Sequence, residues 1–356
     1  MIKFAKTSGV RPAAAILLCM LLLAVAPGCN RIDADQLGLD TRPITSRDRL
    51  YDVSFVSPNE AWAVGYPGII LHSIDGGANW QREQIDTNDA LFAVDFADAL
   101  HGWVVGRGGL VVSTVDGGQT WTSQRIETGQ GEGAARQHLF GVEAISPQHA
   151  VAVGSFGTVA LTLDGGSSWE TTFIESMYSA HLFDVSFVDE NNGLIVGDYP
   201  SWEEWMLEGD EAAALTNIFG TSDGGRSWQP LPVPVKASLY AVEFPDPLHI
   251  RAAGRNGTLI GSEDGGSTWQ QFDSGVEQHL FDVFRLNPQS PLWICGDTGV
   301  LAEADNGTMT RRELGTVIWL RAVSFSDEQH GVVLGGRGTS FYTADGGKTW
   351  ESSEYQ

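Results

Sequence analysis

The sequence has little positive charge. Its 356 residues include 21 Lys and Arg against 45 Asp and Glu, which gives a formal net charge of −24 at pH 7. Nucleic-acid binding needs clustered basic side chains that neutralise phosphates, so we expect no nucleic-acid partner. Charged residues make up only 19% of the chain and hydrophobic residues 42%. This apolar content is too high for a disordered chain.

Cysteine is also scarce. The three cysteines, Cys19, Cys29 and Cys295, are too few for a disulfide framework in a protein of this size. Glycine, in contrast, is abundant, with 43 residues, and there are 12 tryptophans. The composition therefore indicates a large, acidic, glycine-rich globular protein.

The apolar run near the N-terminus is too short to cross a membrane. It extends from Ala13 to Ala26, 14 residues, whereas a spanning helix needs about 20. Basic residues and no acids precede it, as in a secretory signal peptide. The run ends in Ala26-Pro27-Gly28-Cys29, which resembles a bacterial lipobox and implies lipidation of Cys29. The alternative is an ordinary signal peptide with a chance cysteine.

Three segments follow from this reading. Residues 1–28 are the expected lipoprotein signal peptide, residues 29–49 the lipidated cysteine with a flexible tether, and residues 50–356 the folded domain. Removal of the signal peptide leaves 18 basic against 45 acidic side chains, a net charge of −27. A flexible segment of about 20 residues reaches roughly 25 Å, enough to hold a domain off a bilayer. We therefore expect an exported protein that is anchored to a membrane by lipid.

A repeat near 40 residues organises the rest of the chain. Its clearest part is Asp-Gly-Gly-x-x-Trp, and successive Asp positions are 41, 48, 59, 41, 41 and 40 residues apart. A degenerate seventh copy, Asp305-Asn306-Gly307, lies at the spacing that its neighbours predict. The six complete copies begin at Asp75, Asp116, Asp164, Asp223, Asp264 and Asp345. A period of this length with several short strands per unit is typical of a propeller blade.

Each unit contains four predicted strands. An alternating strand such as Leu50–Phe55 comes first, and an apolar strand ending in glycine, such as Ala61–Gly65, comes second. A third strand, such as Ile69–Ile74, leads into the Asp-Gly-Gly hairpin and the Trp strand. The sequence thus predicts an all-β, seven-bladed β-propeller with four antiparallel strands per blade. It leaves open how the ring closes.

The six Asp turns raise the alternative of calcium sites. Each turn supplies one carboxylate, whereas calcium needs several oxygen ligands, and the turns lie far apart on the outer parts of the blades. The Asp carboxylate can instead hydrogen-bond backbone N–H groups of its own turn. We therefore expect a structural role for these aspartates, and no metal or cofactor.

The repeat resembles the Asp-box or BNR repeat, which also occurs in sialidases. That resemblance implies an arginine triad that binds a carboxylate. Arg107, Arg255 and Arg337 occupy equivalent turns, between the second and third strands of blades two, five and seven. These turns are expected on the face opposite the Asp boxes. The Phe/Tyr-Arg-Ile-Pro signature of sialidases is missing, and their propellers have six blades, so we expect no sialidase-type catalysis.

Histidines stand before the first strand of three blades. His138, His181 and His279 precede blades three, four and six, and Asp184 and Asp282 follow two of them. Such a ring at the channel mouth is a candidate for metal binding or titration. The simpler interpretation, which we favour, is a set of polar strand ends that line a wet channel.

Other polar or reactive residues have simpler interpretations. His101, His249 and His330 fall in the turns after first strands, where we expect surface positions. Cys295 aligns with valines of other blades and is expected to be a buried apolar residue rather than a nucleophile.

The longest insertion runs from Asp198 to Asn217 in blade four. It contains Trp202 and Trp205 among several acidic residues, with a spacing that suggests a short amphipathic helix. It is either a lid that packs on the ring or a partner-binding element, for which Trp202 and Trp205 are plausible anchors.

Units of the form Leu-Phe-x-Val-x-Phe, Val-Gly-x-x-Gly and Thr-x-Asp-Gly-Gly-x-x-Trp resemble the photosystem II stability and assembly factor family over residues 50–356. This resemblance implies a non-enzymatic factor, on the periplasmic or thylakoid-lumen side of a membrane, that binds a photosystem II reaction-centre subunit. Photosynthetic members carry an arginine-rich partner-binding patch, of which Arg107, Arg255 and Arg337 are at most a remnant here.

Two functions therefore remain in view after the sequence alone. The first is a lipid-anchored scaffold that binds a membrane-protein complex and aids its assembly, with Arg107, Arg255, Arg337, Trp202 and Trp205 as partner-binding candidates. The alternative is a glycan-binding or sialidase-like glycoside hydrolase of the envelope. A purely structural envelope lipoprotein is a third possibility.

Overall fold

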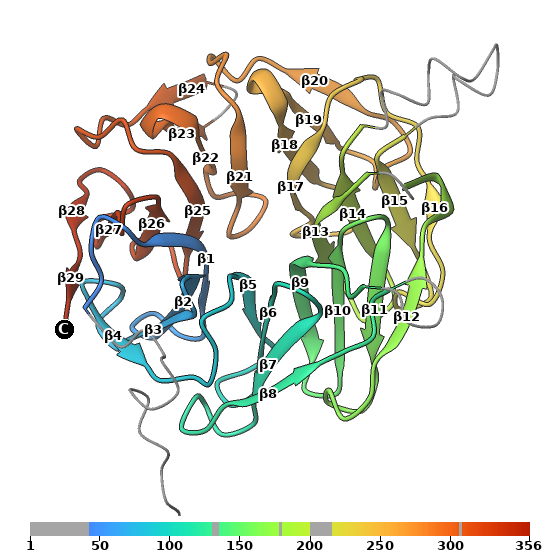
Figure 1. Ribbon diagram of the computed structural model, residues 1–356. Coiled ribbons are helices and arrows are strands. Elements are labelled where there is room, and N and C mark those ends of the chain that lie inside the picture. The colour runs from blue at the N-terminus through green and yellow to red at the C-terminus, as the bar shows by residue number, and fades with distance from the viewer. Residues whose placement is uncertain (1–42, 130–134, 178–179, 200–215, 306–307) are drawn as a thin grey trace, which may run out of the picture.

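The computed structural model describes residues 43–129, 135–177, 180–199, 216–305 and 308–356. In these residues the chain forms seven sheets that surround a central channel as blades (Figure 1). Six sheets have four antiparallel strands and the first has a fifth, so the predicted seven-bladed propeller is confirmed. None of the described helices is long and apolar enough to cross a membrane.

The strands follow the predicted order within each blade, from the channel outward. The first strands are β1 (Arg49–Phe55), β5 (Leu91–Phe96), β9 (Leu139–Ser146), β13 (Leu182–Phe187), β17 (Leu239–Glu243), β21 (Leu280–Phe284) and β25 (Leu320–Phe325). The second strands are β2 (Ala61–Tyr66), β6 (Gly102–Gly106), β10 (His149–Gly154), β14 (Gly193–Gly197), β18 (Ile250–Gly254), β22 (Leu292–Gly296) and β26 (Gly331–Gly335).

The outer half of each blade is built from shorter strands. The third strands are β3 (Ile69–Ser73), β7 (Leu110–Thr114), β11 (Thr158–Thr162), β15 (Ile218–Thr221), β19 (Leu259–Ser262), β23 (Leu301–Asp305) and β27 (Ser340–Thr343). The outermost strands are β4 (Asn79–Glu83), β8 (Thr122–Arg125), β12 (Glu170–Phe173), β16 (Gln229–Pro230), β20 (Gln270–Phe272), β24 (Thr308–Arg311) and β28 (Glu351–Ser352). Short 3₁₀ turns are η2 (Glu175–Met177), η4 (Arg255–Gly257) and η5 (Asp297–Gly299).

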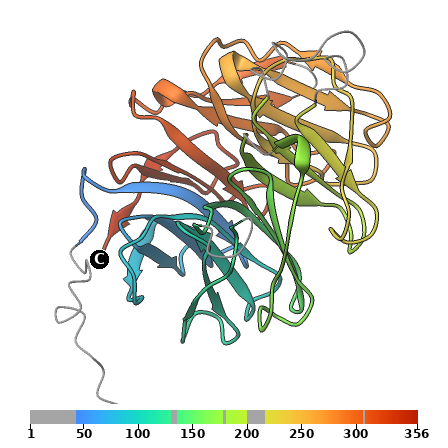
Figure 2. The same ribbon diagram turned by 45° about the vertical axis from the view of Figure 1, so that its right-hand side comes forward.

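The two ends of the described chain close the ring. The last strand, β29 (Glu354–Tyr355), pairs in parallel with β4 at the outer edge of the first blade. On the inner side, Arg49 forms a bridge with Gly336 of the last blade, and Gly338 N–H donates to the Asp48 carbonyl. Asp48 is fully buried, so residues at the end of the expected tether pack on the propeller. Figure 2 shows both ends at this junction.

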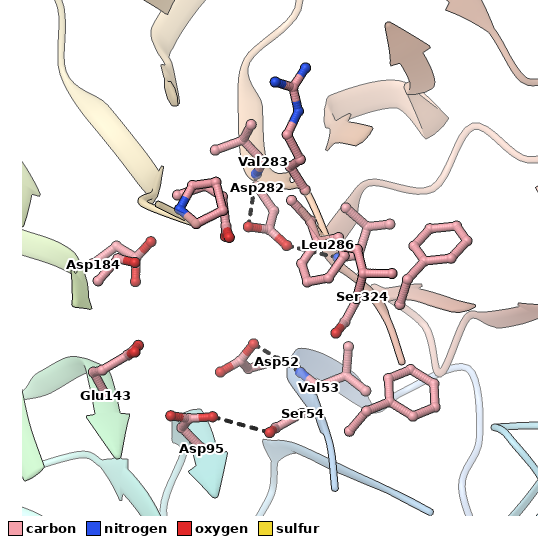
Figure 3. Close-up of a pocket in the computed structure, with 18 of the residues that line it drawn as sticks. Asp52, Val53, Ser54, Asp95, Glu143, Asp184, Asp282, Val283, Leu286 and Ser324 are labelled. Atoms are coloured by element: carbon pink, nitrogen blue, oxygen red, sulfur yellow. Dashed lines mark hydrogen bonds between the residues drawn. The ribbon is translucent and has the colours of Figure 1, made fainter. Parts of the chain in front are cut away.

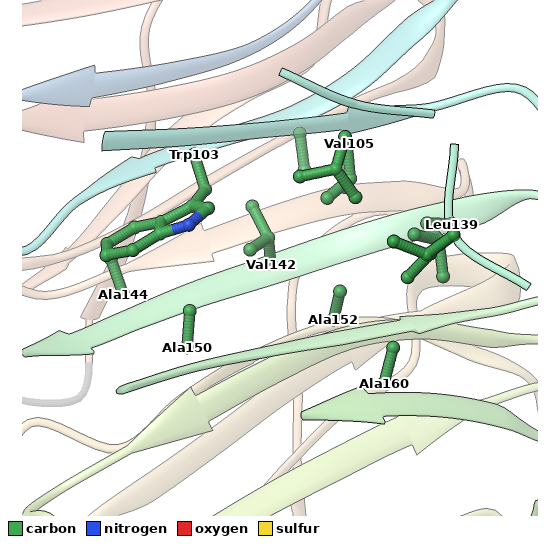
Figure 4. Close-up of a cluster of buried hydrophobic side chains, with 11 residues drawn as sticks. Trp103, Val105, Leu139, Val142, Ala144, Ala150, Ala152 and Ala160 are labelled. Atoms are coloured by element: carbon green, nitrogen blue, oxygen red, sulfur yellow. The ribbon is translucent and has the colours of Figure 1, made fainter. Parts of the chain in front are cut away.

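The core consists of seven apolar layers, one at each interface between blades. In the layer between the second and third blades, Trp103 and Val105 pack against Leu139, Val142 and small alanines (Figure 4). The Trp of each complete Asp box packs towards the preceding blade, as Trp121 does against Trp62 with ring centroids 5.3 Å apart. Burial of these large rings stabilises neighbouring blades against each other.

The six Asp boxes are closed by one repeated set of hydrogen bonds. Asp75 Oδ1 accepts the Ser73 hydroxyl at 2.9 Å and the Asn79 N–H at 2.8 Å, and Ser73 Oγ accepts the Gly77 N–H at 2.9 Å. The same arrangement holds at Asp116, Asp164, Asp223, Asp264 and Asp345. The carboxylates are therefore engaged in their own turns.

These hydrogen bonds also favour the charged carboxylate. Donation from the Ser227 hydroxyl lowers the pKa of Asp223 to about 2, and donation from the Thr349 hydroxyl does the same for Asp345. The second glycine has a positive φ in every box, and in four of the six a Cβ would also lie too close to a neighbouring side chain. Gly118 has a φ of 78°, and a Cβ there would lie 2.1 Å from the Trp62 ring of the preceding blade.

Candidate functional site

Each first strand has a leucine near its start, and the residue after that leucine has no paired residue in the second strand. The register shifts at this position in all seven blades. Such a bulge redirects the side chain of the extra residue. The skipped residues are Tyr51, Phe92, Phe140, Phe183, Tyr240 and Phe281 in blades one to six and Arg321 in blade seven.

The six skipped aromatic residues form a continuous arc around the channel, which we call the aromatic collar. The centroids of neighbouring rings are 5.7, 5.3, 5.9, 5.3 and 5.9 Å apart from Tyr51 round to Phe281. Trp319 stacks on Tyr51 at 6.2 Å. All six residues are half-buried rather than buried, so part of each remains accessible to solvent.

Arg321 fills the gap between the two ends of the arc. Its guanidinium carbon lies 5.5 Å from the centroid of the Phe281 ring, and Nη1 donates to the Phe281 carbonyl at 2.9 Å. Its positive charge lowers the pKa values of Asp184 and Asp282, although burial outweighs this effect in both. The guanidinium therefore contacts the collar at Phe281 and acts electrostatically on two of the channel carboxyl groups.

Six channel carboxylates line the interior below the collar. They are Asp52, Asp95, Glu143, Asp184, Glu243 and Asp282. They surround a cavity of about 710 Å³ that extends to the turns after the first strands. Figure 3 shows five of them, from five blades, directed towards its open centre.

The channel aspartates connect adjacent blades. Asp52 accepts the N–H of the next residue, Val53, and the N–H of Val94 in the adjacent blade, both at 2.8 Å. Asp184 bridges to Val242, and Asp282 bridges to Val323, in the same manner. Both carboxylate oxygens of each residue are thus occupied by backbone donors, which indicates a structural role.

Burial disfavours the charged form of these groups. It raises the pKa of Asp95 and Asp184 to about 6 and that of Asp282 to about 7, against the opposing effect of their backbone hydrogen bonds. Burial and repulsion from Asp282 also raise the pKa of Glu243. Additional negative charge in the channel is therefore unfavourable, and added positive charge is favourable.

The histidines lie beside the collar rather than with the channel aspartates. His138 Nδ1 accepts the Gly108 N–H, and His279 Nδ1 accepts the Asn256 N–H, both at 3.0 Å. His181 contacts the rings of Phe140 and Phe183. Across the described residues, no group of three or more His, Cys, Asp or Glu side chains is placed to hold a metal ion. The histidines and aspartates do not combine into the metal ring considered from the sequence.

Arg107, Arg255 and Arg337 surround the collar on three non-adjacent blades. All three side chains are exposed. Arg107 N–H donates to the Ala90 carbonyl and Arg255 N–H to the Ser238 carbonyl, so their turns lie beside the starts of the first strands. The Asp boxes instead bond to the turns after the first strands, on the opposite face, as expected. Trp202 and Trp205 lie outside the described residues.

The structure also tests the interpretations of Cys295 and of the three histidines in the turns after first strands. Cys295 is fully buried, and burial raises the pKa of its thiol, which confirms an apolar core residue rather than a nucleophile. His101, His249 and His330 lie in surface turns but are partly buried. Each ring Nδ1 pairs with an Asp three residues earlier, namely Asp98, Asp246 and Asp327.

The collar was not predicted from the sequence. The signal was present, because five first strands read Leu-Phe/Tyr-x-Val and β9 reads Leu-Phe-Gly-Val. An aromatic residue in an alternating strand is ordinarily assigned to the core, and only the skipped pairing turns it to the channel. Arg321 was missed because it replaces the aromatic residue in a single blade.

Comparisons with known proteins agree with this architecture. A family model described as Photosynthesis system II assembly factor YCF48 matches residues 80–138, and the BNR/Asp-box repeat model matches residues 341–352. The resemblance to this family and to the repeat is thus confirmed. No curated protein matches the sequence.

Solved structures show the same fold at low identity. YCF48 bound to D1 peptide is 17% identical, with a TM-score of 0.65 over 85% of this chain and 96% of that one. YCF48 from Cyanidioschyzon merolae is 21% identical, with a TM-score of 0.66 over 86% and 99%. An ancestral GH74 enzyme is 13% identical, with a TM-score of 0.63 over 88% of this chain and 47% of that one. At these identities the likeness concerns the fold.

Proposed function

We propose that this protein is a non-catalytic scaffold that binds a segment of a membrane-protein partner on the collar face and aids the partner's assembly. In a photosynthetic host, that partner is a photosystem II reaction-centre subunit. The match to the YCF48 family model and the likeness to YCF48 bound to D1 peptide support this proposal. The observation that carries it is the open aromatic collar, encircled by exposed arginine turns.

The collar face suits a protein partner. Aromatic and arginine side chains dominate the binding energy of protein interfaces, and both are concentrated here. Arg107, Arg255 and Arg337 add exposed positive charge to a chain that is strongly acidic elsewhere. Charges at such a rim chiefly direct association and orientation.

A glycan-binding or glycan-cleaving propeller is the second candidate. The likeness to an ancestral GH74 enzyme and the open rings, on which sugars can stack, favour it. Two observations oppose catalysis. The three arginines stand on blades two, five and seven, separated around the ring, and each channel aspartate that bridges two blades has both oxygens occupied. Glycoside hydrolysis needs a pair of carboxyl groups free to exchange protons or attack, a role that the bridging aspartates do not fit and that leaves Glu143 and Glu243 as the channel groups to test.

We further propose that the protein is exported and anchored through lipidated Cys29 on the periplasmic or thylakoid-lumen side of a membrane. The lipobox-like sequence supports this, although residues 1–42 lie outside the described residues. The Cys29→Ser variant should lose incorporation of labelled fatty acid and appear in the wash from membranes. Continued labelling of that variant would contradict the anchor.

Partner capture in native membranes tests the scaffold function. We expect gentle crosslinking and mass spectrometry to recover one membrane complex with the wild-type protein. The triple variant Arg107→Glu, Arg255→Glu, Arg337→Glu should lose at least about 90% of that complex, because charge reversal reverses the rim field. Trp202→Ala with Trp205→Ala tests the insertion separately.

The matched control reverses charge on the opposite face. Arg226→Glu with Lys348→Glu alters exposed residues of two Asp boxes and should leave capture unchanged. Equal loss in both variants would show a general charge effect and contradict the collar face as the binding surface. Turnover of a chromogenic glycoside that Arg255→Ala abolishes would favour the second candidate.

A further inference from the structure

We propose that the aromatic collar takes one arginine or lysine side chain, presented by an extended segment of the protein partner and directed at the channel carboxylates. This inference rests on the proposed function, because it names the group of the partner that the collar recognises.

The collar is a continuous series of aromatic rings. Its rings come from six consecutive blades, and no neighbouring pair of centroids is more than 5.9 Å apart. These residues are only half-buried, which leaves surface for contact with a further side chain. A cation within about 6 Å of an aromatic centroid is attracted by the negative face of the ring. A group at this mouth can contact more than one ring.

The protein already places one cation in this setting. Arg321 takes the seventh collar position, with its guanidinium 5.5 Å from the Phe281 centroid. The same charge acts on Asp184, Asp282 and Tyr240. A guanidinium that lies over a collar ring and acts on channel carboxyl groups is therefore an arrangement that this structure contains. Among the described residues, no other collar ring has an arginine or lysine over it.

The charge of the channel favours a second cation. The cavity is lined by six carboxyl groups and by Arg285, and the charge of Arg321 also acts on two of these carboxyl groups, Asp184 and Asp282. Two positive groups therefore face six acidic ones. The acidic groups also repel one another, as Glu243 and Asp282 do. A carboxylate at the same place would add to this repulsion, and a neutral sugar would leave it unchanged.

The rim limits how much positive charge the occupant carries. Arg107, Arg255 and Arg337 are exposed around the mouth, and Arg107 already lowers the pKa of His138, second to the effect of burial. Further basic residues in the partner segment would meet these arginines at close range. The fitting segment has one basic residue between neutral or acidic neighbours.

Two synthetic peptides test the inference. The first is acetyl-Ala-Glu-Ala-Arg-Ala-Glu-Ala-amide, and the second replaces its arginine by citrulline, which has nearly the same shape but no charge. We expect calorimetry with the purified full chain to give an affinity for the arginine peptide at least about tenfold higher. Equal affinities, or no binding of the arginine peptide at millimolar concentration, would overturn the inference.

Variants locate the binding. Phe140→Leu with Phe183→Leu keeps apolar side chains but removes two ring faces, and should weaken the arginine peptide about tenfold. Phe173→Leu, a half-buried ring in the outer strand β12, is the matched control and should change nothing. Phe92→Leu replaces the double variant if circular dichroism shows that the double variant is unfolded. Undiminished binding without the collar rings would overturn the inference.

The variant Arg321→Gln distinguishes a collar that binds a cation from a collar that only stabilises the fold. Removal of the resident cation leaves its place to the peptide, so the arginine peptide should bind several-fold more tightly and the citrulline peptide should not. If partner capture depends on the rim arginines but the collar binds the arginine and citrulline peptides equally, the proposed function stands and this inference is rejected. Binding of sialyllactose to the collar in place of both peptides would assign the site to glycans.

Discussion

At the scale of single residues, two groups of aspartates have opposite environments. The Asp-box carboxylates lie at the surface, exposed or partly buried, and accept several hydrogen bonds, which stabilises their charge, with a pKa of about 2 at Asp223 and Asp345. The channel carboxylates are surrounded by protein, which raises the pKa of Asp282 to about 7. Aspartate therefore stabilises the fold in its charged form in the turns, whereas in the channel the protonated form is the one that the folded state favours.

This contrast predicts a stability maximum near pH 4 to 5. An unfolded Asp has a pKa near 3.9. The lowered pKa values in the Asp boxes give stability that is lost as pH falls from about 4 to 2. The raised pKa values in the channel make folding less favourable as pH rises from about 4 to 7. Denaturant unfolding measured between pH 2 and 8 checks both limbs.

The variant Asp282→Asn isolates the channel limb of this profile. It removes the group with a pKa of about 7 but keeps one acceptor for a backbone N–H. The fall in stability between pH 4 and 7 should become shallower, while the acid limb stays as in the wild type. A wild-type stability that rises steadily from pH 4 to 7 would contradict the assignment.

At the scale of strands, the repeat explains how much the sequence revealed. The predicted first strands Leu50–Phe55 and Leu91–Phe96 agree with β1 and β5 to within one residue, because alternation and Asp-Gly turns are local signals. Closure by β29 was not predictable, since Glu354–Tyr355 pairs with a strand more than 270 residues earlier. The collar likewise depends on a pairing shift, as at Phe140, that side-chain patterns do not encode.

Deletion of residues 353–356 tests the closing strand. It removes hydrogen bonds from Glu354 N–H to the Ala78 carbonyl, from Gln356 N–H to the Trp80 carbonyl and from the Tyr355 hydroxyl to the Gly338 carbonyl. At about 1 kcal/mol for each bond, we expect the free energy of unfolding to fall by about 2–4 kcal/mol. The control Tyr355→Phe should lose only about 1 kcal/mol. A deletion as stable as the wild type would show that closure depends on β1 and Arg49 alone.

At the scale of the whole molecule, the two faces of the ring differ in chemistry. The Asp-box face carries self-contained turns whose carboxylates are engaged locally. The collar face carries the aromatic collar, Arg321 and the exposed arginines. Of the two faces, it is therefore the better candidate for binding a partner. The sequence identified the arginine turns and their face from the repeat order. It could not show that they encircle a collar, because that requires the seven blades to be placed around one channel.

The central claim is that the partner binds the collar face, and site-specific photo-crosslinking in native membranes tests it most directly. A photoreactive phenylalanine analogue is placed at Phe140, in the collar, or at Val115, an exposed residue beside an Asp box on the opposite face. The account predicts one crosslinked membrane-protein partner from position 140 and none from position 115. Crosslinks to that partner from position 115 alone, or equally from both positions, would contradict it.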